Sequence, residues 1–309
     1  MAVFDLEGVV RALEGIRADW RTSQQRTREP GEREFPSREA LADIFDKLKR
    51  ALFPMRLGPV DMRHESENFY VGYTLDAALR SLLEQARLEL RRHAPDHPAV
   101  DDHAASIVRR FAAALPDVRR LLDSDVLAAY QGDPAARSVD EVLLCYPGIH
   151  ALIHHRLAHQ LYLLDLPLLA RIAAEIAHGE TGIDIHPGAQ IGPGCFIDHG
   201  TGVVIGETAR IGRGVRIYQA VTLGAKRFVT DADGNLEKGV ARHPIVEDDV
   251  VIYAGATILG RVTLGQGAVI GGNVWITDDV APGATVTQAG PRSTQRPRSL
   301  PGPEQERAA

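Results

Sequence analysis

The stretch "VEDDVVIYAGATILGRVTLGQGAVIGGNVWI", residues 246–276, carries an aliphatic side chain at every sixth position. The repeat positions are Val246, Ile252, Ile258, Leu264, Ile270 and Ile276. The residue four places after each of them is always valine or alanine. Neither a helix nor an ordinary strand has this period, whereas a chain wound into a three-sided solenoid does, with one short strand on each side.

An earlier run has the same period but contains a shift. Its members are Ile185, Ile191, Ile197 and Val203, followed after a slip of two residues by Ile205, Ile211, Ile217 and Leu223. Between the two runs, residues 225–241 ("AKRFVTDADGNLEKGVA") have no aliphatic period and must leave the solenoid as a loop. We therefore predict a solenoid over residues 181–287 with one extruded loop.

The first half of the chain has helical spacing instead. In "LDAALRSLLEQARLELRRH" the leucines recur at intervals of three and four, with charged residues on the other face. Prolines mark the expected helix boundaries: Pro95, Pro98, Pro116, Pro134, Pro147 and Pro167. We predict a charged, partly mobile segment over residues 1–40 and a helical domain over 41–180. The fold class is then α+β, a helical domain followed by a parallel solenoid.

Composition limits the class of partner. The net charge of −6 favours neither nucleic acid nor an anionic membrane. The longest apolar run, residues 161–170, is too short to cross a bilayer, and the N-terminus lacks a basic leader. Only Cys145 and Cys195 are available, so no disulfide framework is possible. These features predict a cytoplasmic protein with no nucleic-acid or membrane partner.

Two histidines interrupt the structural repeat. His199 follows Asp198 and precedes "GTG", and Asp184 lies fifteen positions earlier, slightly under one solenoid turn. A carboxylate partner would make this imidazole a competent base, although a solvent-facing corner residue fits the pattern too. His243 follows Arg242 where the loop re-enters the repeat. It could form a second wall of a pocket with His199, or simply end a loop.

Four more histidines crowd the segment "GIHALIHHRLAHQ". His150 with His154, and His155 with His159, have the i, i+4 spacing of a metal pair. However, no glutamate follows the first histidine as in a metalloprotease helix, and no cysteine cluster supports a site. We expect these rings to lie on the helix surface or to pack, and we predict no metal.

Three motifs together make a family resemblance. The segments "GIDIHPGAQIGPGCFIDHGTGVVIGETARIG", "QAVTLGA" and "RHPIVEDDVVIYAGATILGRVTLGQGAVIGG" resemble those of serine O-acetyltransferases. Upstream, "QGDPAARSVDEVLLCYPGIHALIHHRLAHQLY" resembles the Asp-Pro-Ala segment of that family and the helix after it. The likeness covers roughly residues 131–286. It implies a left-handed β-helix, because handedness does not follow from the spacing.

The resemblance implies a reaction and its catalytic residues. The activity would be transfer of acetyl from acetyl-CoA to L-serine, giving O-acetyl-L-serine in cysteine biosynthesis. His199 would be the general base that takes the serine hydroxyl proton, and Asp184 would orient its ring. His243 would hold or help to polarise the serine.

The resemblance also implies the binding residues. Arg242 would bind the serine carboxylate, and Asp198 and Asp133 would bind the ammonium group. Acetyl-CoA would lie in a groove between neighbouring β-helices, against the small residues Gly224, Ala225, Ala254 and Gly272. The implied assembly is a homotrimer or a dimer of trimers, with active sites at subunit boundaries.

The chain departs from the family at two places. The 225–241 loop is longer than in familiar members, so Arg242 could approach serine differently. The tail, residues 288–309, is rich in proline and arginine, is expected to be disordered, and ends in alanine. Members that bind O-acetylserine sulfhydrylase do so through a C-terminal isoleucine, so we expect no such complex by that route.

Three other functions remain open from the sequence. A related hexapeptide acyltransferase could act on homoserine or a sugar, with His199 but without the amino-acid clamp. A solenoid zinc carbonic anhydrase would need three converging histidines, for which His186, His199 and His243 are available. A non-catalytic scaffold would leave both active-site histidines idle.

Overall fold

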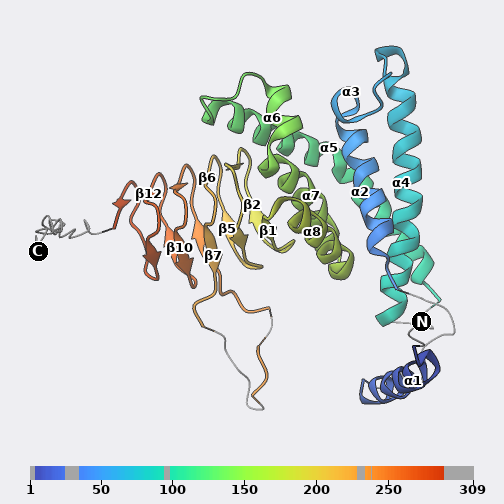
Figure 1. The fold of residues 1–309 in the computed structure, drawn as a ribbon. Helices are drawn as coiled ribbons and strands as arrows, with labels where there is room; N and C mark the ends of the chain where they lie inside the picture. Colours follow the sequence, from blue (N-terminus) through green and yellow to red (C-terminus); the bar gives the residue numbers. More distant parts are fainter. Residues whose placement is uncertain (1–3, 25–34, 94–97, 228–233, 238, 289–309) are drawn as a thin grey trace, which may run out of the picture.

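The structure is a computed structural model that describes residues 4–24, 35–93, 98–227, 234–237 and 239–288. A helical half lies beside a β-helix, and the first helix stands apart from the helical half (Figure 1). The helices are α1 (Leu6–Ser23), α2 (Arg38–Leu52), α3 (Pro54–Leu57), α4 (His64–His93), α5 (Val100–Gly132), α6 (Val139–Cys145), α7 (Pro147–Leu163) and α8 (Pro167–Thr181). None of the helices in these ranges is both long and apolar enough to span a membrane.

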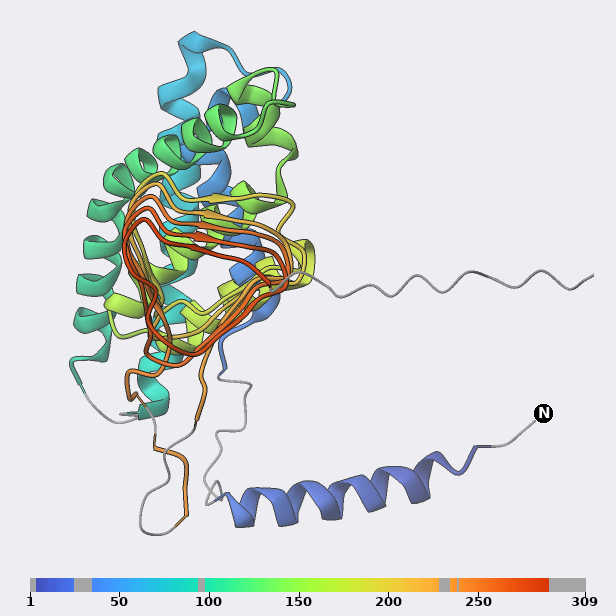
Figure 2. The same cartoon turned by 90° about the vertical axis from the view of Figure 1, so that its left-hand side faces the viewer.

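The β-helix consists of very short parallel strands. They are β1 (Asp184–Ile185), β2 (Gln190–Ile191), β3 (Phe196–Ile197), β4 (Val204–Ile205), β5 (Arg210–Ile211), β6 (Arg216–Ile217), β7 (Thr222–Gly224), β8 (Ile245–Val246), β9 (Val251–Ile252), β10 (Thr257–Leu259), β11 (Thr263–Leu264), β12 (Val269–Ile270), β13 (Trp275–Ile276) and β14 (Thr285–Val286). Seen nearly end-on, the coils have a triangular outline (Figure 2). The predicted α+β fold with a hexapeptide solenoid is thereby confirmed.

Three parallel sheets form the sides of this prism. Sheet A has the order β1-β4-β7-β10-β13, sheet B β11-β8-β5-β2, and sheet C β14-β12-β9-β6-β3. The repeat positions point inward and are almost all fully buried, for example Ile217, Leu223 and Ile258 at 0% exposure. We name the corner between sheets C and A the C–A edge, and the corner between sheets A and B the A–B edge.

The two-residue slip in the sequence has a structural location. Ile185 pairs with Ile205, whereas Ile205 pairs with Leu223, so the first coil spans 20 residues and the second 18. The extra residues lie in the β3–β4 turn, which therefore protrudes from the C–A edge. The prediction that placed Val203 at a repeat position is wrong, because Val203 precedes β4 and Ile205 takes that position.

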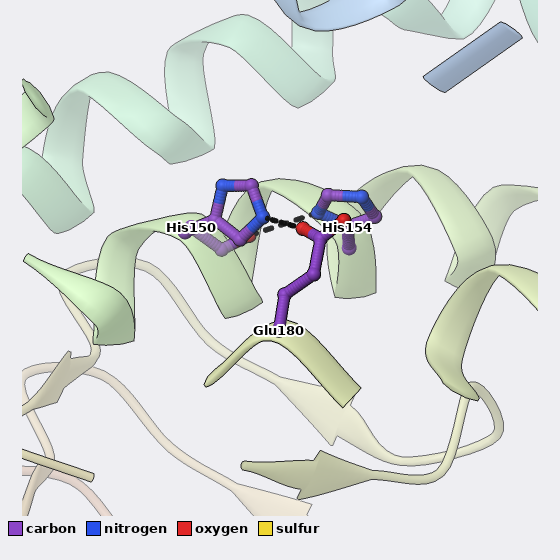
Figure 3. Close-up of side chains that lie close together, drawn as sticks. All are labelled: His150, His154 and Glu180. Carbon is purple, nitrogen blue, oxygen red and sulfur yellow. Dashed lines mark hydrogen bonds and ion pairs between the residues drawn. The ribbon is translucent and has the colours of Figure 1, made fainter. Parts of the chain in front are cut away.

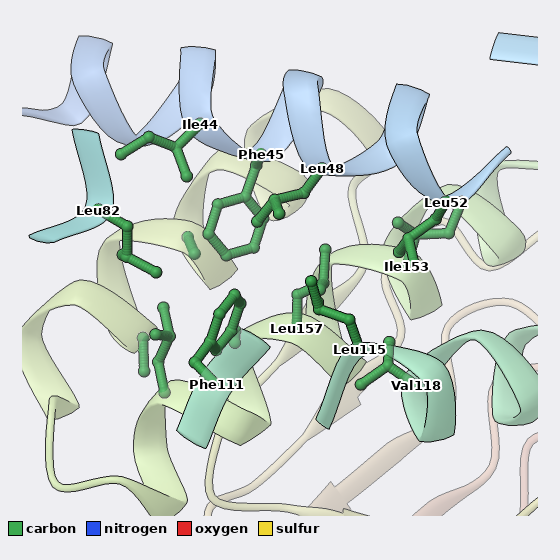
Figure 4. Packing of buried hydrophobic residues seen from close by; sticks show 14 of the residues in the cluster. Ile44, Phe45, Leu48, Leu52, Leu82, Phe111, Leu115, Val118, Ile153 and Leu157 are labelled. Carbon is green, nitrogen blue, oxygen red and sulfur yellow. The ribbon is translucent and has the colours of Figure 1, made fainter. Parts of the chain in front are cut away.

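The helical half has its own core. Phe45 and Leu48 of α2 face Phe111 of α5 and Leu157 of α7 (Figure 4), and all four side chains are fully buried. Helix α5 runs without interruption through Pro116, so the boundary predicted there is wrong. Leu115 and Val118 on either side of it are buried, and this packing offsets the cost of about 3 kcal/mol for an interior proline.

A buried ion pair joins the two halves. Arg156 of α7 donates from Nε and Nη2 to both oxygens of Asp125 in α5, at 2.5 and 2.7 Å. Arg156 also donates to the carbonyl oxygens of Ile191 and Gly192 at the end of β2, at 3.1 and 2.9 Å. The backbone N–H of Cys195 completes the pairing by donating to Asp125 Oδ1 at 2.9 Å. This network fixes the helical half against the first coil, where the candidate site lies.

The terminal predictions fall partly outside the described residues. The segment 1–40, predicted to be mobile in part, includes helix α1 and the first residues of α2. Residues 289–309 of the predicted tail lie outside the described ranges. The chain leaves the coil between β7 and β8, as predicted for the loop 225–241 (Figure 1), although residues 228–233 and 238 are not described.

Candidate active site

The protruding turn at the C–A edge presents His199. This residue adopts φ 57°, in the left-handed region, and the N–H of Gly200 donates to the carbonyl of Asp198 at 2.6 Å across it. Non-glycine residues are uncommon in this region and cluster at functional sites. The imidazole is 72% exposed, and its Nε2 lies 3.8 Å from Asp198 Oδ1. The ring is therefore accessible to a substrate, with an acid beside it.

Asp133 lies at the same corner, although it is far from His199 in sequence. It caps the C-terminus of α5, and its Oδ1 accepts a hydrogen bond from the N–H of Ala135 at 2.8 Å. Its Oδ2 accepts one from the Tyr146 hydroxyl, which lies between α6 and α7. These two bonds lower the pKa of Asp133, and the His199 ring is close enough to contribute to the same shift. The carboxyl is thus ionised beside the histidine.

A close contact holds α7 against this turn. A Cβ on Gly148 would lie 2.1 Å from the carbonyl oxygen of Ile197, the residue before Asp198. Only glycine lets the helix approach the end of β3 this closely. The predicted residues Asp133, Asp198 and His199 therefore meet at one corner of a single chain.

Asp184 is less directly connected to His199. Its N–H donates to the carbonyl of Val203 at 2.9 Å, one coil below the protruding turn. Its carboxylate lies near the carboxylate of Glu175 and the ring of His178. One oxygen or ring nitrogen of each of the three side chains lies within 4.8 Å of the others. In the described ranges no ion pair joins Asp184 to His199. Its role in orienting the base stays a prediction.

His243 occupies a different environment, at the A–B edge. It is 7% exposed, and its Nδ1 accepts a hydrogen bond from the backbone N–H of Thr208 at 3.1 Å. Because a backbone N–H can only donate, the proton of the neutral ring is on Nε2. Burial, followed by the charge of Arg242, lowers the pKa of His243 to about 4. The ring is therefore a neutral donor near pH 7.

Glycine and threonine make room for this ring and hold it. A Cβ on Gly206 would lie 2.0 Å from the His243 ring, so a larger residue would displace the imidazole. Thr208 Oγ1 accepts hydrogen bonds from the backbone N–H groups of Arg242 and His243, at 2.9 and 3.1 Å. The re-entry of the loop is thereby anchored to the preceding coil.

Arg242 is part of a chain of polar contacts. Its Nη2 donates to Glu207 Oε2 at 2.8 Å, and the Tyr162 hydroxyl of α7 donates to Glu207 Oε1 at 3.1 Å. Burial raises the pKa of Glu207, but the bonds from Arg242 and Tyr162 outweigh it and lower that pKa overall. The ionised glutamate orients the guanidinium, and Nη1 also donates to the Val240 carbonyl at 3.2 Å. A guanidinium has five N–H donors, so three are left for an anion.

The two histidines do not meet within one chain. His199 precedes β4 at the C–A edge, whereas His243 precedes β8 at the A–B edge, on the other side of sheet A. His186, in the β1–β2 turn, also lies on the A–B edge, where its Nδ1 accepts from the Gly188 N–H at 3.0 Å. The three histidines considered for zinc are thus split between two edges of one chain.

The residues predicted to bind acetyl-CoA are split in the same way. Ala254 and Gly272 lie in successive turns of the C–A edge, and the N–H of Asn273 donates to the Ala254 carbonyl at 2.9 Å. Gly224 and Ala225 lie at the A–B edge, where Gly260 N–H donates to the Gly224 carbonyl at 3.0 Å. Both edges of sheet A are therefore lined by small residues.

Two rings of the histidine-rich helix α7 are packing groups, which is one of the two predicted alternatives. His154 and His155 are 2% and 3% exposed, because α7 is packed between the helices and the β-helix. His150 Nε2 lies 2.5 Å from Glu180 Oε2 (Figure 3). His154 Nδ1 donates to the His150 carbonyl at 3.1 Å, and the His154 ring stacks on that of Phe45 with centroids 5.5 Å apart. The arrangement is a hydrogen-bonded packing cluster.

Sequence reasoning missed four polar residues of the site. They are Tyr146, Tyr162, Glu207 and Thr208. All four lie inside the segments that carry the family resemblance, which assigned them no role. Their partners lie 13 to 45 residues away, and no spacing in the sequence identifies such contacts.

Comparison with known proteins agrees with this architecture. Residues 243–278 match the family model described as bacterial transferase hexapeptide (six repeats). The chain is 58% identical over 265 residues to the plasmid serine acetyltransferase of Synechococcus elongatus, which covers 84% of this chain and 83% of that relative. A crystal structure of serine acetyltransferase isoform 3 from Entamoeba histolytica, in complex with cysteine, matches with a TM-score of 0.68 at 34% identity, over 82% of this chain and 84% of that one. The Neisseria gonorrhoeae serine acetyltransferase in complex with serine matches with a TM-score of 0.53 at 28% identity, over 80% and 95%.

Proposed function

The chain belongs to the serine acetyltransferases, and from this membership we propose that it transfers acetyl from acetyl-CoA to the hydroxyl of L-serine. The product is O-acetyl-L-serine, a precursor for cysteine biosynthesis. The observation that carries the assignment is the corner at which an exposed histidine lies beside two acids, Asp133 and Asp198. Serine needs an acid to bind its ammonium group and a base to take the proton of its hydroxyl.

The reaction follows from the chemistry of these groups. His199 takes the proton of the serine hydroxyl as the oxygen attacks the thioester carbonyl of acetyl-CoA. The tetrahedral oxyanion collapses, the C–S bond breaks, and the protonated ring returns its proton to the leaving thiolate. The ammonium group of serine binds Asp133 and Asp198. In this proposal the attack is direct and forms no acyl-enzyme. Cys195 is buried, which raises its pKa to about 12 and makes it a poor nucleophile, and Cys145 lies in no nucleophile motif.

The separation of the two edges supports a shared site. Arg242 and His243 lie at the A–B edge, so they reach the His199 corner only from a second copy of the chain. A cyclic trimer brings the A–B edge of each subunit against the C–A edge of the next, because a head-to-tail interface closes into a ring. In such a ring, Arg242 binds the serine carboxylate and the Nε2–H of His243 donates to an oxygen of the same serine.

The same ring provides a groove for acetyl-CoA. Ala254 and Gly272 follow His199 along the C–A edge, and the neighbouring subunit contributes Gly224 and Ala225. Small side chains at all four positions let the pantetheine arm approach the backbone. The reaction needs no metal in this scheme. Both cysteines are free thiols, which fits the cytoplasmic location that we propose.

The test is thiol release from acetyl-CoA with serine, homoserine and a sugar alcohol as acceptors. We expect turnover with serine and at least tenfold lower kcat/KM with homoserine, since a tenfold preference corresponds to about 1.4 kcal/mol of differential transition-state binding. Equal turnover with homoserine or the sugar would replace this assignment by that of a related hexapeptide acyltransferase.

A further inference from the structure

We propose that Tyr146 is a positioning residue, which orients the Asp133 carboxylate toward the ammonium group of serine. The inference rests on the proposed function, because it assigns the amine-binding role to Asp133. Tyr146 lies in the upstream segment that resembles the family, but the resemblance assigns it no role. What connects it to the site is its hydroxyl, which donates to Asp133 Oδ2.

Two donors hold the carboxylate, one on each oxygen. Tyr146 donates to Oδ2, and the backbone N–H of Ala135 donates to Oδ1 at 2.8 Å. A carboxylate has about four acceptor sites, so each oxygen keeps a lone pair for the substrate amine. Without the phenol, the group would be held on one oxygen only and could rotate about its Cβ–Cγ bond.

Tyr146 is itself fixed between two helices. Its N–H donates to the carbonyl of Val142 at the end of α6, at 3.1 Å. Its carbonyl accepts from the N–H of Ile149 in the first turn of α7, also at 3.1 Å. The contact of Gly148 with Ile197 then ties this junction to the turn that carries Asp198 and His199. The hydroxyl is therefore aligned with the catalytic corner by the backbone.

A tyrosine suits this position better than a cation does. Arg216 lies close by, since a Cβ on Gly132 would approach its Nη2 to 2.5 Å, and its guanidinium lies over the Phe196 ring at 5.4 Å. An arginine bonded to Asp133 would neutralise the carboxylate and compete with the substrate ammonium. Tyr146 stays protonated, because the bond to Asp133 raises its pKa to about 12. It therefore orients the acid and leaves its negative charge for the amine.

The test is steady-state kinetics of Tyr146→Phe on the full-length assembly. We expect KM for serine to rise about tenfold, the size expected for losing a hydrogen bond to a charged group, while kcat and KM for acetyl-CoA stay within about twofold. Tyr130→Phe is the matched control, since Tyr130 lies one turn before Asp133 in α5 and is 38% exposed. It should match the wild type in all three constants, and both variants should keep the thermal midpoint.

A double variant separates positioning from a general structural role. If Tyr146 acts through Asp133, adding Tyr146→Phe to Asp133→Ala should not raise KM for serine further, because coupled residues are not additive. Additive effects, or an unchanged KM for serine in the single variant, would overturn the proposal. A wild type that fails to acetylate serine would instead refute the proposed function, so the two failures are distinguishable.

Discussion

The two histidines of the site differ in almost every physical respect. His199 protrudes from the C–A edge with 72% of its side chain exposed and an unusual backbone conformation. His243 is 7% exposed at the A–B edge, and its Nδ1 is held by Thr208. One ring can exchange a proton with a substrate, whereas the other is kept neutral with its proton on Nε2.

Histidine serves two different tasks in this protein because the two edges are built differently. The C–A edge gained two residues in one turn, which lifts His199 out of the coil. The A–B edge instead packs the chain that returns from the loop over Gly206, which removes water from His243. His199 is therefore suited to act as a base and His243 as a fixed donor, and each role can be tested separately.

The sharpest test of the contrast is His199→Ala. Loss of the general base should lower kcat by about 10² to 10⁴, with the thermal midpoint unchanged because the ring is exposed. His64→Ala is the control, because His64 lies in the first turn of α4 and its side chain is 81% exposed. Undiminished turnover of His199→Ala in a serine-dependent acetyl-CoA assay would assign the base elsewhere.

A second prediction concerns the separation of the edges. His199→Ala and His243→Ala should each be nearly inactive, but co-expressed with different affinity tags they should form mixed trimers. In a ring where each site uses His199 of one subunit and His243 of the next, every mixed trimer has one intact site of its three, so about a third of the wild-type activity should return. Activity of doubly purified mixed trimers checks this. No recovery would mean that both histidines serve one site within a chain.

Much of the β-helix was predictable because inward-facing positions impose a strict period. His199 was identified for a related reason, since an acid and an imidazole have no packing role in such a repeat. The corner that each turn occupies was not predicted from the sequence, because it depends on the two residues inserted before Ile205. The interpretation of His243 as a second wall of a pocket with His199 does not hold within one chain, because the coils place the two histidines on different edges.

The helical half was harder to predict in detail. Helical spacing identified the segments, but a local rule failed at Pro116, where packing of α5 on both sides outweighs the lost hydrogen bond. The sequence left open whether the histidines of α7 lie on the surface or pack, and His154 and His155 are buried because α7 is enclosed by the β-helix as well as by helices. The contact of Tyr146 with Asp133 joins the ends of two helices, and it exists only once they are packed.

A third prediction sharpens the description of the A–B edge. Thr208→Val keeps the shape of the side chain but leaves the N–H groups of Arg242 and His243 without their acceptor. We expect kcat/KM for serine to fall about tenfold, since an unsatisfied buried donor costs about 1 to 3 kcal/mol. Thr208→Ser retains the oxygen and should stay within about twofold of the wild type. Equal losses in the two variants would contradict this, because they would show that the hydroxyl matters no more than the methyl group.

The smallest expected effect is on stability and follows from the buried ring. The pKa of His243 is about 4 in the folded protein, against an ordinary value of 6.5 in the unfolded chain. As pH falls from 6.5 toward 4, the unfolded chain binds a proton that the folded protein does not, so stability is lost in this window and is fully present above it.

His154, whose pKa burial also lowers to about 4, contributes in the same direction. Burial lowers the pKa of His150, His155, His159 and His186 as well, so replacing His243 by Gln removes one of several contributions while keeping an N–H donor at the Nε2 position. The loss of unfolding free energy between pH 7 and 5, measured by urea denaturation, should then be smaller than in the wild type by on the order of 1 kcal/mol. Identical slopes for His243→Gln and the wild type would show that His243 is not desolvated, and the distinction between the two edges would fail.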